Sequence, residues 1–140
     1  MRIRDVLAVA TLCVLVGCGD SGPFDYVPVT GKLSYEDGSL ISDAQSVRLG
    51  FVAMDRSGEQ SQRPRPAKAP INLADGSFDH ATSYKYGDGL VPGKHRVVIV
   101  ARDKNGRPAK ITKREYTSAE TSPLVVDTAD APFDIKIPKP

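Results

Sequence analysis

The stretch PGKHRVVIVAR at residues 92–102 decides the fold class of this chain. Its centre, Val97–Val100, is a run of β-branched residues, which favour strands over helices. The Pro-Gly pair before the run is typical of a tight turn. Side chains alternate between the two faces of a strand, so His95 shares a face with two of the aliphatic residues. The stretch predicts a β-strand over 94–102, in which His95 either lies at the edge of the core with its polar tip in water or marks a local shift of the pattern.

Shorter β-type runs, bounded by turn signals, lie on both sides of this stretch. The Asp-Gly pairs at 37–38 and 75–76 are typical of tight turns between strands, and no run has helical periodicity. The loop Met54–Pro70 contains several prolines, which hold it extended. Seven short strands at such spacing predict an all-β fold, a seven-stranded antiparallel β-sandwich. The other six strands are expected at 27–35, 47–53, 71–73, 78–81, 124–126 and 133–137.

Composition and charge argue against several classes of function. The chain has 140 residues, with 19 Lys and Arg against 17 Asp and Glu, and a formal net charge of +2. This length accommodates one domain. The nearly balanced charge argues against a nucleic-acid-binding protein. The absence of Trp and the 6% aromatic content argue against a stacking surface for sugars or single strands.

The first eighteen residues have the organisation of a targeting segment. Arg2 and Arg4 precede an apolar run of eleven residues at 6–16. Such a run is shorter than the roughly 20 residues that a helix needs to cross a bilayer, but it fits the core of a signal peptide. The Leu-Val-Gly-Cys sequence at 15–18 resembles the lipobox of bacterial lipoproteins.

The lipobox resemblance implies cleavage before Cys18 and a lipid on its thiol, the nucleophile of that chemistry. Residues 1–17 would then be a lipoprotein signal peptide, and 18–26 a lipidated N-terminus and tether. Cys13 would be removed with the signal, so the mature chain would hold no disulfide. The implied location is the bacterial cell envelope, with the domain anchored to a membrane outside the cytoplasm. A plain secretory signal that contains a cysteine is the alternative.

Three further stretches carry a second resemblance. They are Val29–Tyr35 with the turn after it, Ala74–Phe78 and Gly87–Ile99. Together they are similar to the carboxypeptidase regulatory-like domains found in many small bacterial lipoproteins. The resemblance implies a transthyretin-like (prealbumin-like) Greek-key sandwich over residues 27–138. It implies no catalytic residue, because these domains are accessory to the catalytic ones and their motifs consist of turn glycines and core residues.

Catalytic and metal-binding chemistry has little support in the residues. His80 and His95 lie on different predicted strands, and no third ligand for zinc can be named. No Gly-x-Ser-x-Gly motif is present. A hydrolase with a related transthyretin-like fold ends in Tyr-Arg-Gly-Ser, whereas this chain ends in Ile-Pro-Lys-Pro. We therefore expect a non-enzymatic protein without metal or cofactor, and keep a transthyretin-like hydrolase as the weakest alternative.

Two basic stretches are the candidate binding residues. One lies in the proline-rich loop and the other, residues 102–114, has six basic residues against a single Asp. Such clusters bind anionic polysaccharide or lipid headgroups, although ordinary solvated loops have the same composition. Our first expectation is a binding or structural module that contacts a protein or matrix partner through an exposed edge strand or the loop Met54–Pro70. The binder of an anionic ligand is the alternative, and nucleic acid is not expected. The residues expected to contact an anionic ligand are Arg63, Arg65, Lys68, Arg102, Lys104 and Arg107.

Overall fold

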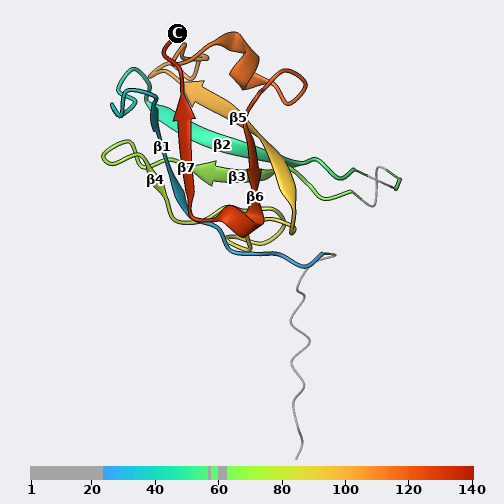
Figure 1. The fold of residues 1–140 in the computed structure, drawn as a ribbon. Helices are drawn as coiled ribbons and strands as arrows, with labels where there is room; N and C mark the ends of the chain where they lie inside the picture. The colour runs from blue at the N-terminus through green and yellow to red at the C-terminus, as the bar shows by residue number, and fades with distance from the viewer. Residues whose placement is uncertain (1–23, 57, 60–62) are drawn as a thin grey trace, which may run out of the picture.

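A computed structural model describes residues 24–56, 58–59 and 63–140. Within these residues the chain is mostly β and forms two sheets from seven strands (Figure 1). The all-β prediction is therefore confirmed at this level. The predicted signal peptide 1–17 and the lipidation site Cys18 lie outside the described residues. No helix within the described residues is long and apolar enough to cross a membrane.

The strands divide into a three-stranded and a four-stranded sheet. The three-stranded sheet has the order β4 (Ser77–Phe78), β1 (Gly31–Tyr35), β7 (Phe133–Ile137). The four-stranded sheet has the order β3 (Ala67–Pro70), β2 (Ser46–Ala53), β5 (Lys94–Arg102), β6 (Val125–Asp127). Two short 3-10 helices lie between strands along the chain: η2 (Arg114–Thr117) between β5 and β6, and η3 (Thr128–Asp130) between β6 and β7.

The core lies between the two sheets. In β5 the buried and less buried residues alternate along the whole strand, as the sequence predicts. Phe51 of β2 is fully buried, and its ring packs against Phe78 and Phe133, each with ring centroids 6.1 Å away. These two partners belong to the other sheet, so the three phenylalanines join the layers. Their burial supplies a large part of the hydrophobic stabilisation.

The prediction of a wholly antiparallel sandwich is wrong at one pair of strands. β1 and β7 run parallel, with Leu33 opposite Ile135 at the centre of the pair. The physical reason is that β7 is separated from β1 by almost the whole chain, so no tight turn requires the two to be antiparallel. A sequence pattern reports which residues are strand-like, but it carries no information on the direction of such a distant partner.

The third strand lies earlier than predicted. β3 covers Ala67–Pro70 and pairs antiparallel with β2, whereas a strand was expected at 71–73 and a proline-held loop up to Pro70. Alanines supply the inward side chains of β3, and these small residues give only a weak hydrophobic pattern. Pro70, the last residue of the strand, is tolerated because β3 is the edge of its sheet. Lys68 therefore belongs to a strand and not to a loop.

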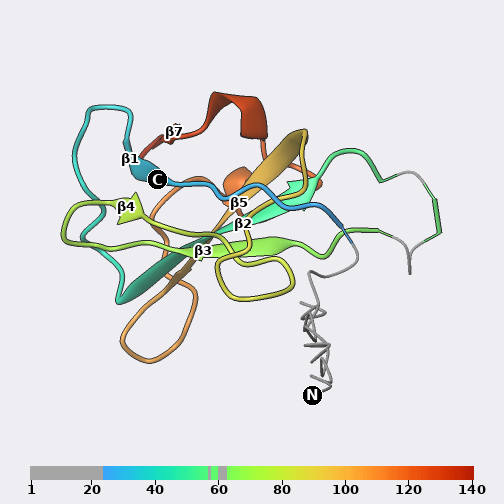
Figure 2. The ribbon, with the colours of Figure 1, turned by 90° about the horizontal axis from the view of Figure 1, so that it is seen from below.

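The domain has two distinct ends, which β5 connects. The strand makes eight steps from Lys94 to Arg102, or about 27 Å at the usual rise. At its start, the N-terminal segment is held by the Val27–Leu90 bridge, with hydrogen bonds of 2.7 and 3.0 Å. In Figure 1 this segment passes below the sheets, while the loops after β5 and the C-terminus lie at the top. Seen from below, the N-terminal segment lies across the near side (Figure 2).

Candidate binding groove beside strand β5

One edge of β5 has neighbouring strand segments only near its two ends, within the described part of the chain. Near its start, β6 pairs with residues 94–96. Near its end, the chain returns and the Ala109 N–H donates to the Ala101 carbonyl at 2.9 Å. Between these contacts, residues 110–123 leave the edge and form η2 and the adjoining turns. The interruption opens a groove along the strand.

Ile99 is the residue of β5 whose main chain faces this interruption. The Val97 N–H donates to the Leu124 carbonyl at 2.9 Å and thus points to the same edge. Main-chain groups two residues apart in a strand point the same way. The N–H and C=O of Ile99 are therefore directed toward the groove, as at the open edge of a sheet.

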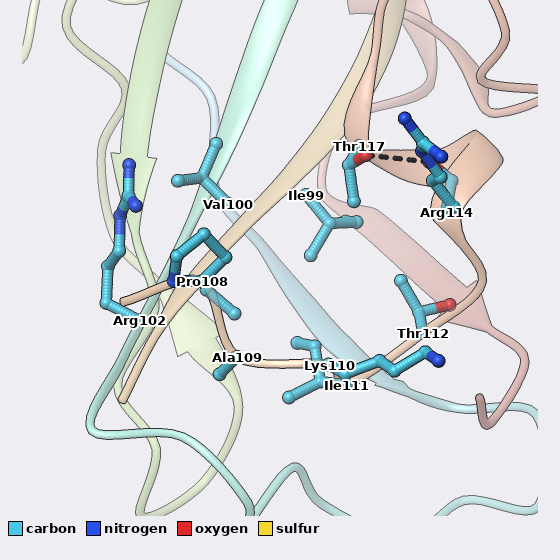
Figure 3. Close-up of a pocket in the computed structure, with 11 residues that line it drawn as sticks. Ile99, Val100, Arg102, Pro108, Ala109, Lys110, Ile111, Thr112, Arg114 and Thr117 are labelled. Carbon is cyan, nitrogen blue, oxygen red and sulfur yellow. Dashed lines mark hydrogen bonds between the residues drawn. The ribbon is translucent and has the colours of Figure 1, made fainter. Parts of the chain in front are cut away.

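The groove has a volume of about 460 Å³ and combines an apolar floor with a basic rim. Apolar side chains such as Val100 and Pro108 lie around the hollow, and Arg102 and Arg114 stand on opposite sides of it (Figure 3). Lys110 is the third cation of the rim. This size falls in the range of small-ligand sites. The lining residues are Ile99, Val100, Ala101, Arg102, Pro108, Ala109, Lys110, Ile111, Thr112, Arg114 and Thr117.

Hydrogen bonds hold both walls of the groove in place. On one wall, the Tyr35 hydroxyl donates to the Ile111 carbonyl at 2.8 Å, and Thr112 donates to the Pro138 carbonyl at 2.8 Å. On the other, the Thr117 hydroxyl donates to the Arg114 carbonyl at 2.6 Å, closing η2. The rim cations therefore stand on a preformed frame.

The single acid of the basic stretch is used by the turn that follows β5. The Asp103 carboxylate accepts the N–H groups of Asn105 at 2.8 Å and Arg107 at 3.0 Å. Gly106 completes this turn with a φ of 75°, a conformation that favours glycine. Asp103 is therefore occupied as a turn former, and none of the groove-lining residues is acidic. The rim is positive without a neutralising carboxylate of its own.

The structure divides the six predicted contact residues into two separate groups. Of the second basic stretch, Arg102 lines the groove, whereas Lys104 and Arg107 are exposed on the turn and do not line it. Lys110 and Arg114 complete the rim; they belong to the predicted basic stretch 102–114 but were not among the six named contact residues. Their only sequence signal is the density of basic residues. Their position depends on where the chain leaves β5, which no local pattern reports.

The basic residues of the proline-rich segment lie elsewhere. Ala67 pairs with Phe51 of β2, and Arg102 pairs with Ser46 of β2. Phe51 and Ser46 are five residues apart along the strand, which corresponds to about 17 Å. Arg65 lies beyond Ala67 at the far end, where its guanidinium stacks on the Tyr84 ring, 5.7 Å from the centroid.

The other two residues of this group also lie away from the groove. Lys68 points outward from β3, and the Arg63 Nε is buried without a hydrogen-bond partner among the described residues. The two predicted basic groups do not form one surface.

The two histidines do not come together into a metal site. His80 contacts the Asp79 carboxylate at 2.5 Å, and His95 is buried with its Nδ1 3.2 Å from the Gly93 carbonyl. Within the described residues, no group of three or more His, Cys, Asp or Glu side chains could hold a metal ion.

Comparisons with known proteins leave the assignment to the residues themselves. No family model, no curated protein and no solved structure matches this chain at a significant level. The observations that bear on function are therefore the groove, its charge and its place in the fold.

Proposed function

We propose that this chain is a lipid-anchored, non-enzymatic binding module of the bacterial cell envelope, and that the groove beside β5 binds an anionic ligand. One observation carries the binding proposal. Arg102, Lys110 and Arg114 surround an apolar hollow of about 460 Å³ that no acidic side chain lines. A pocket with apolar walls and a few convergent charges is the usual form of a small-ligand site. An acidic polysaccharide presents negative charges at short, regular intervals, and these can meet the three cations of the rim.

The anchor part of the proposal rests on the sequence. The lipobox-like Leu-Val-Gly-Cys sequence at 15–18 would place two or three acyl chains on Cys18, enough for stable attachment to a membrane. A transthyretin-like, carboxypeptidase regulatory-like domain at 27–138 agrees with the two-sheet architecture and remains part of the proposal. The groove offers cations, hydroxyls and apolar groups, which support binding rather than hydrolysis.

A second candidate ligand is an extended acidic segment of a protein partner. The observation that favours it is the direction of the Ile99 main chain, which faces the groove in a stretch of β5 without a neighbouring strand. An extended peptide can add to such an edge through main-chain hydrogen bonds. The peptide would need acidic side chains to match the rim.

The test is heparin affinity of the detergent-solubilised full chain, with Cys18 acylation read by mass spectrometry on the same sample. Arg102→Glu with Arg114→Glu should weaken binding by roughly tenfold or more, because two rim contacts become repulsive. Lys104→Glu with Arg107→Glu changes the net charge equally outside the groove and is the matched control. An equal loss in both double variants would overturn the groove as the site.

Competition against heparin on the unaltered chain separates the two ligands. Poly-glutamate that displaces heparin at lower concentration than a sulfated oligosaccharide of similar charge would favour the peptide edge. The reverse order would favour the polysaccharide. An unmodified chain that begins at a residue other than Cys18 would contradict the anchor without affecting the groove.

A further inference from the structure

The aromatic side chains are divided between the core and one exposed place. The chain has five Tyr, four Phe and no Trp. Three Phe and Tyr35 are buried, and Tyr116 packs against the core. The remaining four are Phe24, Tyr26, Tyr84 and Tyr86, which we call the tether-end patch. Tyr84 and Tyr86 are 40% and 84% exposed.

Ring and charge contacts connect the members of the tether-end patch. Phe24 and Tyr26 meet edge to face, with centroids 6.5 Å apart. Burial raises the pKa of Tyr26. Asp88 and Tyr84 raise this pKa further and Arg65 lowers it, in keeping with their nearby positions.

Each of the two exposed tyrosines of the patch has its own partner. The Arg65 guanidinium lies over the Tyr84 ring, and the His80 ring lies 4.6 Å from that of Tyr86. The patch is thus a cluster of aromatic rings with basic groups among them.

Hydrogen bonds to one carboxylate fix the conformation of the loop that carries Tyr84 and Tyr86. The Asp88 carboxylate accepts the N–H groups of Ser83, Tyr84 and Lys85 at 2.8–3.0 Å. Burial alone would raise the pKa of Asp88, but these N–H groups hold it below its ordinary value. Tyr84 and Tyr86 are therefore held exposed on this loop, where their rings contribute little to the hydrophobic stabilisation of the core.

Close packing joins the same loop to the N-terminal segment. A Cβ on Gly89 would lie only 1.9 Å from the Val27 carbonyl oxygen. Gly89 also has a φ of 101°. Only glycine allows the loop to approach the segment this closely, so the loop packs directly against the segment.

The patch lies where the chain leads to Cys18. Phe24 follows Cys18 by six residues, which span at most about 21 Å when fully extended. If Cys18 is acylated, this end of the domain stays within that distance of the bilayer. The loops after β5, which form one side of the groove, lie at the opposite end of the domain (Figure 1). The short connection places the aromatic rings near the headgroups.

We propose that the tether-end patch seats the domain on the headgroup region of an anionic bilayer. Tyrosine has an apolar ring and a polar hydroxyl and favours the membrane–water interface. Arg65 and Lys85 add attraction to anionic lipids. Within the described residues, the carboxylates near this end include those of Asp25, Asp79 and Asp88 and, beside the start of β5, those of Asp127 and Asp130. Asp79 contacts His80, Asp88 is held by main-chain N–H groups, and Asp127 accepts the Ala129 N–H. The proposal rests on the anchor of the proposed function, but not on the groove.

The test uses the absence of Trp from the chain, which allows a single reporter. The full chain, purified from membranes and reconstituted into vesicles of anionic lipid, carries Tyr86→Trp or, as the matched control, Lys104→Trp on the distal turn. Quenching by lipids brominated near the headgroup should be at least about twofold stronger for Tyr86→Trp, because interfacial rings lie at that depth. Adding Arg65→Glu should reduce this quenching, whereas adding Arg107→Glu should not.

Failure of the docking and failure of the anchor give different results. An acylated Cys18 with equal quenching at both reporters overturns the docking and leaves the anchor intact. If Cys18 is not acylated in cells, the chain with Cys13→Ser is coupled through Cys18 to a maleimide lipid, and the same comparison is made. Stronger quenching at position 86 then supports the docking even though the natural anchor is absent, and equal quenching overturns it.

Discussion

At the scale of single residues, His95 is the position where sequence and structure are most informative together. Alternation predicted that it shares a face with Val97 and Ile99, and the structure confirms this. The side chain is only 3% exposed, so its polar tip is not in water. Burial lowers the pKa of His95, opposed by the Gly93 carbonyl and by Asp127 of β6. The folded state therefore favours the neutral form of this imidazole.

A buried neutral histidine makes the stability depend on pH. Because the pKa of His95 is lowered in the folded state, the unfolded chain binds the proton more readily below about pH 6.5. We expect the free energy of unfolding to fall as the pH drops from 7.5 to 5.5, measured by urea denaturation. His95→Gln should reduce that fall, whatever its effect at pH 7.5. His80→Gln is the control for loss of an imidazole, and an equal reduction in both variants would contradict the assignment.

At the scale of elements, β1 depends on the absence of a side chain at its first residue. Gly31 pairs with Phe78 of β4 on one side and with Phe133 of β7 on the other. A Cβ on Gly31 would lie 2.6 Å from the Phe133 carbonyl oxygen and 2.7 Å from the Phe78 ring. The parallel and antiparallel neighbours of β1 thus meet at this glycine. The glycine is visible in the sequence, but its two neighbours are not.

This crowding reverses the usual effect of replacing glycine in a strand. At an open strand position Gly→Ala stabilises by about 0.5–1 kcal/mol. At Gly31 we expect Gly31→Ala to lower the free energy of unfolding by about 1–3 kcal/mol through overpacking, measured by urea denaturation. A neutral or stabilising result would show that the sheet relaxes around the methyl group. Gly38→Ala, where no atom lies within 4 Å, measures the cost of a positive φ alone.

At the scale of the whole molecule, the two surfaces proposed for binding lie at opposite ends of β5. The groove surrounds the end of the strand at Arg102, and the tether-end patch adjoins the Val27–Leu90 bridge before its start. The turn of Lys104 and Arg107 projects at the groove end. A domain seated on a bilayer through the patch would leave the groove open to the surrounding space.

This separation predicts that membrane attachment does not affect ligand binding. The heparin affinity of the chain anchored in neutral vesicles should agree within about twofold with that of the chain in detergent, because a rigid domain binds alike in both. Isothermal titration calorimetry on both samples measures it. Lys85→Glu at the patch should leave both affinities unchanged, and a strong loss on vesicles alone would show that the bilayer covers the groove.

Local signals in the sequence were sufficient for the all-β class, for most of the strands and for the buried face of β5, because alternation and turn residues act over a few positions. Tertiary structure alone decided the parallel β1–β7 pair, the place of β3 and the separation of the two basic groups. It also gathered Arg102, Lys110 and Arg114 around one hollow and four aromatic rings at the tether. These features arise from contacts between segments far apart in the chain, and such contacts leave no periodic pattern in either segment.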